Sequence, residues 1–508
     1  MDLLESPDRI TVRGNGFLAA FDSASGRMVS LKYAGREMLA LEQGPQVNLF
    51  RAPGDNDGYA AGAWRAAGLD SLKHEAIAIH AEKSSGMVRV TTHNRATGKG
   101  GFFCESSITY SFLADGTLLL DAVILPSNPS LILPRCGLRL ALDPALSLVE
   151  WLGRGPWENY PDRKTGSPIG RYQLAVKDFF EPYVRPQFMA NREDVSWLSI
   201  GDDKGCLLVW NPTGSEFSFS ALRMTDEDLA AAKHPTELVE RDATFLTLDA
   251  AVTGIGGASC GPATLEKYRV DGRPRRMTLA FRTAPAGGHD GMLPDSFRFG
   301  TPAIPVRDAA GNLTISASPA SIHIDDRPAT LPLKLEQGTV LAVAEYAEGG
   351  IPATPVRRSF LFQLDRSAWQ ATASSDEPGE GPAAKAIDNN PATYWHTRWQ
   401  GQAPAPPHDF ILDLGSTMEL RGLSCLPRQD NINGRIQAYR IDLSPDGMKW
   451  ETAAKGEWPD SADLHEALFD APQKARWIRL TAITTRHGPW ASAAEIAPIP
   501  AQSPSKDR

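Results

Sequence analysis

The 508-residue sequence predicts an all-β protein built of several domains. Its apolar residues recur in short alternating runs such as ITVRGNGFLAAFD, and alternation with a period of two residues is typical of half-buried strands. The 44 glycines and 39 prolines interrupt these runs with turns, and helical periodicity is scarce. A single hydrophobic core rarely grows beyond about 250–300 residues, so we expect about three domains.

The first predicted domain covers residues 10–284 and follows an N-terminal segment, residues 1–9. Its many short strands favour one large antiparallel β-sandwich. Within the run SSITYSFLADGTLLLDAVIL, the residues LADGT at 113–117 are expected to form a hairpin turn, because Asp and Gly tolerate turn geometry. The run EDLAAAKH at 227–234 is the best candidate for a short helix.

Two further domains are predicted after it. Residues 285–365 are expected to form a small β-sandwich spacer, with strands in NLTISASPASIHI and TVLAVAEYAEG. Residues 366–498 are expected to form a third β-sandwich, with strands FILDLG, AYRIDLSPDG and ARWIRLTAI between turn-rich loops. The tail, residues 499–508, is predicted to be disordered, as chain ends commonly are.

Composition excludes several classes of function. The net charge of −9 is spread without long single-sign runs, so no basic stripe indicates a nucleic-acid partner. No stretch of 18 apolar residues and no export signal occurs, so no membrane partner is expected. The protein is cytoplasmic if Met1 is the true start, and periplasmic or extracellular if the chain is a fragment of a secreted enzyme. Five widely spaced cysteines favour neither a disulfide framework nor a zinc site.

The most specific motif of the first domain is WLGRGPWENYPDR at 151–163, a turn-rich loop that presents fixed polar groups. With five further blocks in the same order, it resembles the small-chain domain of the family 2 β-galactosidases. This resemblance implies a supersandwich fold shared with galactose mutarotases. The five blocks are LFRAPGDND (49–57), EPYVRPQ (181–187), NREDVSW (191–197), HPTEL (234–238) and GIGGASCGP (254–262).

The resemblance assigns no catalytic residue to this chain. Glycoside hydrolysis commonly uses two carboxyl groups, but in this family both are glutamates on a (β/α)₈ barrel of about 250 residues, which this chain does not contain. The carboxylates of Asp55, Asp57, Glu158 and Asp162 are therefore interpreted as acceptors that fix loops. His234 has two interpretations, a mutarotase-like acid or base and, more simply, a capping or packing histidine.

Two departures from the family pattern bear on the substrate pocket. Cys260 stands where enteric members place a tryptophan beside the bound sugar, so we expect it at the pocket rim with a smaller stacking surface. Phe188, Met189 and Ala190 replace the usual polar and glycine residues, which argues against a polar role for that turn.

The third domain resembles the discoidin-like (coagulation factor 5/8 type C) jelly-roll sandwiches, which include many galactose-binding carbohydrate modules. The resemblance covers the whole domain. The matching stretches are AIDNNPATYWHTRW (386–399), FILDLG (410–415), LPRQDNINGRIQAYRIDLSPDGMKW (426–450), ARWIRL (475–480) and ASAAEI (491–496).

A structural Ca²⁺ site is expected in this module. Oxygens of Asp388, Asn390 and Thr393 lie in one short loop, Glu495 could close the site, and Ca²⁺ requires six to eight oxygen ligands. Related modules often bind calcium at this place. The alternative is a hydrogen-bonded loop without metal.

A sugar site is also expected, because sugar rings need planar hydrogen-bonding groups and an aromatic face. Arg428, Asn433 and His396 are the expected donors, and Trp490 is the expected platform. In the alternative, Arg428 only pairs with Asp430, and His396 and Trp399 belong to the core.

The leading hypothesis is a non-catalytic C-terminal part or small subunit of a β-galactosidase that hydrolyses terminal β-galactose residues. Its partners would be a catalytic barrel, on an upstream segment or another subunit, and a galactose-containing glycan. The chain alone is expected to be inactive. The alternatives are a stand-alone carbohydrate-binding protein and a mutarotase-like sugar epimerase.

Overall fold

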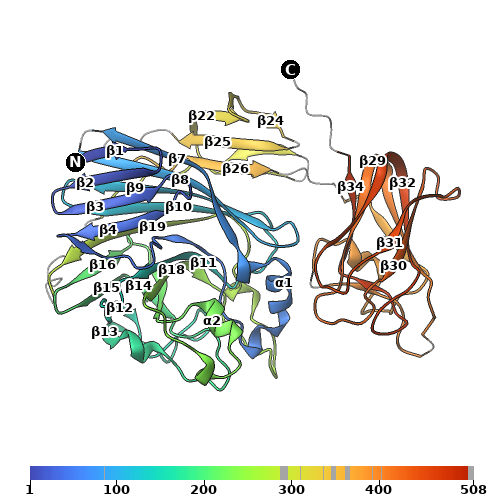
Figure 1. Cartoon of the computed structure of the whole chain (residues 1–508), viewed down its shortest axis with the longest axis horizontal. Helices are drawn as coiled ribbons and strands as arrows, with labels where there is room; N and C mark the ends of the chain where they lie inside the picture. Colours follow the sequence, from blue (N-terminus) through green and yellow to red (C-terminus); the bar gives the residue numbers. More distant parts are fainter. Residues whose placement is uncertain are drawn as a thin grey trace. The chain divides into compact units, whose positions relative to one another are not determined.

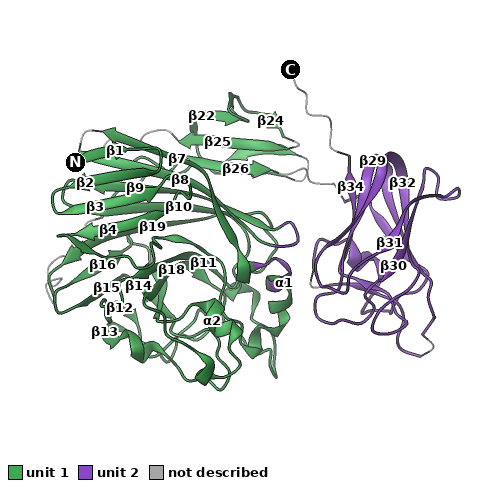
Figure 2. Ribbon diagram, viewed as in Figure 1, with its two compact units in different colours: residues 1–64, 69–98, 102–363 green, residues 65–68, 99–101, 364–508 purple. Residues whose placement is uncertain are grey.

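The computed structural model describes residues 1–84, 86–286, 296–308, 311–335, 337–344, 350–360, 366–391, 393–401 and 403–501. Over these ranges the chain is nearly all strands, which confirms the predicted all-β class (Figure 1). It divides into two compact units, the first made of residues 1–64, 69–98 and 102–363, and the second of residues 65–68, 99–101 and 364–508 (Figure 2).

The first unit is built of antiparallel sheets. In sheet order, the described strands of its three large sheets have the following bounds. The first sheet contains β1 (Asp2–Glu5), β2 (Arg9–Gly14), β3 (Phe17–Asp22), β4 (Met28–Tyr33) and β5 (Arg36–Glu37). The second contains β13 (Ile169–Ala175), β12 (Leu148–Arg154), β15 (Trp197–Asp202), β16 (Gly205–Trp210), β19 (Arg275–Ala284), β10 (Leu118–Pro126), β9 (Phe103–Leu113), β8 (Met87–Thr97) and β7 (Lys73–Ser84). The third contains β14 (Arg192–Val195), β17 (Phe217–Leu222), β18 (Thr244–Val252), β11 (Arg135–Leu142) and β6 (Gln46–Asn48).

Strand β10 lies inside the second sheet, between β9 and β19. Every residue of β10 is buried, so the strand reads as the continuous run LLLDAVILP rather than as an alternation. The predicted LADGT turn joins β9 to β10, with Phe112 opposite Leu118, and this prediction is confirmed. The buried Asp121 carboxylate accepts hydrogen bonds from Arg276 at 2.7 Å and from Thr354 at 2.8 Å.

The strands of the expected spacer belong to the first unit. Buried hydrogen bonds join them to its second sheet, including Ser359 N to Glu105 Oε2 at 2.6 Å and Arg89 Nη2 to Ala353 O at 3.2 Å. These strands are β20 (Pro305–Arg307), β21 (Asn312–Ile315) and β24 (Leu333–Lys334) in one sheet, and β23 (Arg327–Pro328), β22 (Pro319–Ile324), β25 (Gly338–Ala344) and β26 (Val356–Phe360) in another.

The second unit contains the predicted C-terminal β-sandwich. Its core is apolar and includes Trp369, Trp395, Phe410 and Ile478. Burial of such aromatic side chains contributes about 1.5–3 kcal/mol each. The described strands are β27 (Gln370–Ala373), β29 (His408–Leu426), β32 (His465–Ala482), β30 (Ala438–Ser444), β31 (Glu451–Glu457) and β34 (Glu495–Pro500) in one sheet, with β28 (Trp395–His396) paired to β33 (Ser492–Ala493).

The α-helices among the described residues are short. The predicted helix is α2 (Asp226–Ala231), which starts because Thr225 and Asp228 form a capping box and stops short of Pro235, which holds His234 in an extended conformation. The sequence pattern missed α1 (Ala61–Ala66). Within the described part of the chain, neither helix has the length and apolarity of a membrane span. The prediction of a disordered tail is wrong for residues 499 and 500, which belong to β34 (Glu495–Pro500) and pair with β29 (His408–Leu426). Residues 502–508 lie outside the described residues.

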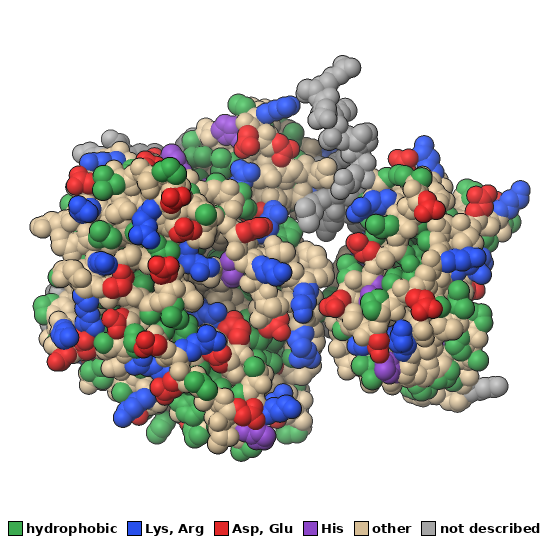
Figure 3. Space-filling model, viewed as in Figure 1, with side chains coloured by type: hydrophobic (Ala, Val, Ile, Leu, Met, Phe, Trp, Pro, Cys, Tyr) green, Lys and Arg blue, Asp and Glu red, His purple; other side chains and the backbone are tan. Residues whose placement is uncertain are grey.

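Charge is mixed on the surface. On the face drawn in Figure 3, acidic and basic side chains are interspersed over the first unit and form no field of a single sign. On this face the pattern agrees with the charge distribution along the sequence.

Candidate functional site

Four of the six sequence blocks of the first domain meet at one cavity of about 270 Å³. Segments about 200 residues apart in the chain contribute to it, so the blocks are a single structural feature. The lining residues are Gly54, Asp55, Asn56 and Asp57 from the first block, Glu158, Tyr160 and Arg163 from the second, Tyr183 and Gln187 from the third, Ile255 and Ser259 from the last, and Phe188.

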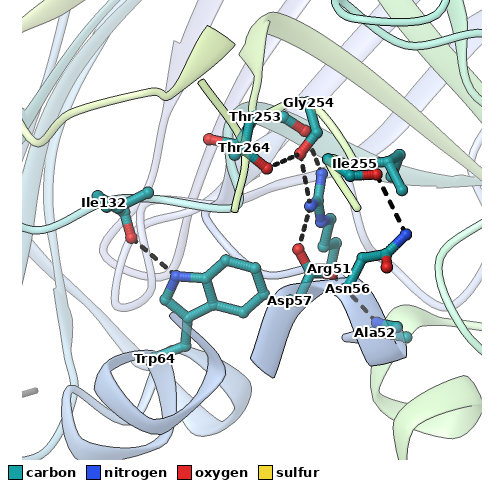
Figure 4. A network of polar contacts seen from close by, with 12 residues as sticks. Arg51, Ala52, Asn56, Asp57, Trp64, Ile132, Thr253, Gly254, Ile255 and Thr264 are labelled. Carbon is teal, nitrogen blue, oxygen red and sulfur yellow. Dashed lines mark hydrogen bonds and ion pairs between the residues drawn. The ribbon is translucent and has the colours of Figure 1, made fainter. Parts of the chain in front are cut away.

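Arg51 anchors the floor of this region. Its side chain is fully buried and pairs with Asp57 at 2.5 Å, and it also donates to the carbonyl oxygens of Thr253 and Gly254 (Figure 4). Arg51 also packs over the rings of Trp64 and Phe188, at 5.5 and 5.3 Å from the ring centroids. The ring of Phe188, which stands where the family usually has a polar or glycine residue, therefore packs against a buried cation and has a structural role.

The glycine-rich loop is held by Asp162. Its two carboxylate oxygens accept the backbone N–H groups of Ile255 at 2.9 Å and Gly256 at 2.7 Å. A Cβ on Gly254 would lie 2.6 Å from the Asp162 carboxyl carbon, so only glycine permits this close approach. Asn56 fastens the same loop from the other side, donating to Gly256 O and accepting from Ser259 N (Figure 4 shows Asn56 reaching the loop).

Glu158 is engaged in the same manner. It accepts the hydroxyl protons of Tyr183 and Tyr160, the latter at 3.2 Å, and the backbone N–H of Ala190 at 3.0 Å. Burial, together with the Glu158 charge, raises the pKa of Tyr183 above its usual range, so both hydroxyls remain protonated donors. The contacts of Asp57, Glu158 and Asp162 are those of loop-fixing carboxylates, and Asp55 lines the cavity beside them.

The two remaining candidates of this unit are exposed. Cys260 is an exposed free thiol next to Ser259, which lines the cavity, so its assignment to the pocket rim remains a prediction. The His234 side chain is 66% exposed and pairs through Nδ1 with Glu237 at 2.8 Å. It therefore neither caps the following turn with its ring nor packs in the core.

In the second unit, the expected sugar-site residues lie at one corner of the module. The His396 ring lies 4.6 Å from Trp399 and 6.1 Å from Trp490, centroid to centroid. The Arg428 guanidinium lies 3.9 Å over the ring of Tyr394. Sequence reasoning missed Tyr394 as a support for Arg428, although it lies in the quoted stretch at 386–399.

Asn433 joins this corner through Ser492. The Ser492 hydroxyl donates to Asn433 O at 2.8 Å, and Ser492 is paired with His396 across β33 and β28. Arg428 does pair with Asp430, at 2.6 Å, and is itself only 7% exposed. Trp490 is half-buried, and its Nε1 is buried without a hydrogen-bond partner in the protein.

The structure changes the role expected of His396. Its Nδ1 lies 2.6 Å from Thr397 O and must carry the proton, because a carbonyl only accepts. Burial lowers the pKa of His396, so the ring is neutral near pH 7 and its Nε2 is an acceptor. In this tautomer His396 would meet a sugar as an acceptor rather than as the expected donor, and the sugar site itself stays a prediction.

The expected calcium residues also meet. Thr393 Oγ1 lies 2.7 Å from Asp388 Oδ2, 2.9 Å from Asn390 O and 3.5 Å from Lys385 O. A hydroxyl has one proton and can satisfy only one of these three acceptors at a time, so oxygens converge here in excess of donors. The carbonyl of Lys385 gave no sequence signal, because every residue carries one.

Glu495 closes the same cluster. Its Oε2 accepts a hydrogen bond from Arg366 at 2.6 Å, and its Oε1 is buried without a hydrogen-bond partner in the protein. Burial raises the pKa of Glu495, and the charge of Asp388 adds to the effect. A buried carboxylate oxygen without a donor, near the Asp388 carboxylate and near hydroxyl and carbonyl oxygens, fits a hard cation such as Ca²⁺. Among the described residues no group of three or more His, Cys, Asp or Glu side chains could hold a metal, and this cluster contains two carboxylates.

Comparison with known proteins agrees with both resemblances. Residues 13–282 match the family model described as beta galactosidase small chain, and residues 370–496 match that of the F5/8 type C domain. The β-galactosidase of Lactobacillus delbrueckii subsp. bulgaricus is 34% identical over 282 residues, which cover 54% of this chain and 27% of that protein. The β-galactosidase of Streptococcus thermophilus is 31% identical over 262 residues, covering 51% and 25%.

Solved structures match the C-terminal module. The family 32 carbohydrate-binding module of NanJ from Clostridium perfringens, in complex with galactose, is 34% identical, covering 27% of this chain and 96% of that one, with a TM-score of 0.25. The C-terminal domain of a chitobiase from Bacteroides fragilis is 24% identical, covering 27% and 97%, with a TM-score of 0.26.

These matches have different extents. The chain spans about a quarter of the length of the β-galactosidases it matches, and the matched part is its own first half. Since the small-chain match extends over residues 13–282, more than half of the 508 residues, this chain belongs to the β-galactosidase small-chain family.

Proposed function

We propose that this chain is the non-catalytic C-terminal part, or small subunit, of a β-galactosidase that hydrolyses terminal β-galactose residues. The observation that carries the proposal is the cavity at the glycine-rich loop, where Asp57 and Glu158 are already bound to arginine, tyrosine and backbone donors. Retaining glycosidases require one carboxylate as a nucleophile and another as an acid. Carboxylates held in this way shape a pocket wall, and the reacting pair would come from a barrel on an upstream segment or a partner subunit.

The test is complementation. The isolated chain is expected to leave a nitrophenyl β-galactoside unhydrolysed. Mixing it with the portion of the L. delbrueckii enzyme that precedes the matched 282 residues should produce hydrolysis that neither part shows alone. Hydrolysis by the isolated chain above the blank would overturn the proposal. If that segment restores no hydrolysis, the polypeptide encoded directly upstream of this chain is tested in the same way. If it also restores no hydrolysis, a stand-alone carbohydrate-binding protein becomes the better description.

The second part of the proposal is that the C-terminal module holds a galactose-containing glycan. Arg428 and the Trp490 N–H supply donors, His396 Nε2 supplies an acceptor, and the Trp490 ring offers an apolar face. Asn433 lies beside them. A single small sugar buries little area, so binding would be weak and would serve to keep the enzyme near its glycan.

Calorimetric titration with galactose, N-acetylgalactosamine and lactose tests this part. Arg428→Ala should remove the heat of binding. Arg476→Ala, which breaks another bidentate arginine–aspartate pair, with Asp413 on the sheet of the same module, should leave it intact. Unchanged binding by the Arg428 variant would refute the residue assignment.

The oxygen cluster of the module supports a structural Ca²⁺ as a further proposal. Asp388, Thr393 and Glu495 would bind it with side-chain oxygens, and Asn390 and Lys385 with carbonyl oxygens. The ion would be the positively charged partner that the buried Glu495 Oε1 lacks within the protein, and it would hold the loop in place.

A further inference from the structure

A second cavity of the first unit, of about 340 Å³, shares no lining residue with the cavity at the glycine-rich loop. It lies where β6 and β11, at the edge of the third large sheet, meet the start of β7 and helix α2. Its volume falls in the range of about 300–1,000 Å³ that small-molecule sites occupy.

Asn48 makes this cavity a built site. The residue is only 5% exposed, and its Oδ1 accepts the backbone N–H of Phe50 at 3.2 Å. This bond fixes the orientation of the amide, so Nδ2 is the free end, and Nδ2 is buried without a hydrogen-bond partner in the protein. Arg27 also lines the cavity, and its Nε is likewise buried without a partner. Buried donors left unpaired are costly, so an acceptor from a ligand or from a bound water is expected here.

The charges of the lining balance. Arg139 is bound to Glu227 by two hydrogen bonds of 2.7 and 3.2 Å, and Arg27 is offset formally by Asp70. Burial lowers the pKa of His74 to about 4, so this side chain is neutral near pH 7. A free anion would meet the carboxylates of Glu227 and Asp70. A neutral molecule with several hydroxyl groups can both accept from the free donors and donate to the carboxylates.

We propose that this cavity binds a neutral sugar or related polyol through Asn48 Nδ2 and Arg27, as a carbohydrate site separate from the one in the C-terminal module. No Phe, Tyr or Trp side chain lines the cavity, so recognition would rest on hydrogen bonds and affinity would be low. The site goes beyond the proposed function and does not depend on the barrel.

Saturation-transfer NMR with galactose and lactose tests the site. The full-length chain used carries Arg428→Ala, which should remove sugar binding by the C-terminal module. Asn48→Asp keeps the acceptor for Phe50 N and replaces the free donor with an oxygen. We expect it to weaken the residual binding by about tenfold, the loss typical of one hydrogen bond to a buried donor. Asn128→Asp is the matched control, because Asn128 Oδ1 accepts the backbone N–H two residues later in the same way, outside the cavity.

The outcomes separate this site from the module. Residual binding that falls with Asn48→Asp but not with Asn128→Asp supports the cavity. The inference would be overturned by the absence of a residual signal, by a signal that Asn48→Asp leaves unchanged, or by a signal that inorganic phosphate displaces. In each of these cases, loss of the calorimetric heat with Arg428→Ala would still support sugar binding by the C-terminal module. Should Asn48→Asp fail to fold, Arg27→Met removes the second donor from a half-buried position and should also weaken the signal.

Discussion

The glycine-rich loop of the first unit differs from the two candidate sites of the second unit, the oxygen cluster at Glu495 and the corner at Trp490, in how many of its polar groups have hydrogen-bond partners. Both oxygens of Asp162 accept backbone N–H groups, whereas Glu495 has one oxygen bound to Arg366 and one buried without a partner. The indole N–H of Trp64 donates to Ile132 O at 2.8 Å, whereas that of Trp490 has no partner. A buried polar group with its partners holds the loop, whereas the unpaired oxygen of Glu495 and the unpaired N–H of Trp490 lie beside the residues of the two proposed ligand sites.

The largest difference is expected between two arginine–aspartate pairs. Arg51→Met leaves Asp57, only 3% exposed, as an uncompensated buried charge, so the free energy of unfolding should fall by about 3–5 kcal/mol. Arg428→Met leaves Asp430, 56% exposed, in water, and should cost about 1 kcal/mol or less while removing sugar binding. Denaturant unfolding of both variants measures the contrast, and equal losses would contradict it.

The next effect concerns Asp162. Asp162→Ala leaves the N–H groups of Ile255 and Gly256 without their charged acceptor, so the free energy of unfolding should fall by about 2–3 kcal/mol. Hydrogen exchange should increase at these two amides more than in the strands. If both amides keep their wild-type protection, Asp162 does not hold the loop.

Calcium and pH should act on the module through Glu495. The pKa of Glu495 in the folded state lies above the ordinary value of 4.5, so the folded state holds this proton more tightly than the unfolded state does. Without calcium, stability should therefore fall as the pH rises from 4.5 through the raised pKa. Ca²⁺ binds the ionised form, so its stabilising effect, about 2.7 kcal/mol at 100 times its Kd, should grow over the same pH range.

Thermal unfolding of the full chain with Ca²⁺ or a chelator, between pH 4.5 and 8, measures this effect. Glu495→Gln should abolish the calcium effect and reduce the pH dependence, of which other buried carboxyl groups supply a part. Glu419→Gln, an exposed glutamate on β29, is the control and should change neither. A calcium effect that survives in the Glu495 variant would exclude this site.

The smallest expected effect is the difference in stability between substitutions of Trp64 and of Trp490. Trp64→Phe loses the hydrogen bond to Ile132 O and should cost about 1–2 kcal/mol. Trp490→Phe breaks no protein hydrogen bond, so stability should change by less than about 0.5 kcal/mol while sugar affinity falls. Calorimetric titration and denaturant unfolding of both variants provide the comparison. A stability loss in Trp490→Phe as large as in Trp64→Phe would assign Trp490 to the core.

Much of the fold was predictable because its signals are local. The two apolar runs of β9 and β10 and the LADGT turn between them predicted a hairpin that the structure contains. The contacts of Asp57, Glu158 and Asp162 agree with their interpretation as loop-fixing groups, and for Asp55 it stays a prediction. Helix α1 was missed because six residues carry too little periodicity, and α2 ends early because Pro235 excludes a helical conformation at His234.

The site residues show the limit of such reasoning. Motif spacing identified the neighbourhood of His396, Arg428, Asn433 and Trp490, yet the proton position on His396 depends on the carbonyl of Thr397 and on burial. Tyr394 beneath Arg428 and the carbonyl of Lys385 near Thr393 likewise follow from the folded loop.

From residue order alone came the fold class, the two family resemblances and the candidate loops, because strand periodicity, turn chemistry and motifs are written in neighbouring residues. Tertiary structure decided which polar groups are paired within the protein and which are not, as at Asn48 and Glu495. The physical reason is that hydrogen-bond satisfaction depends on atoms brought from afar, as Arg51 meets a carbonyl 202 residues along the chain.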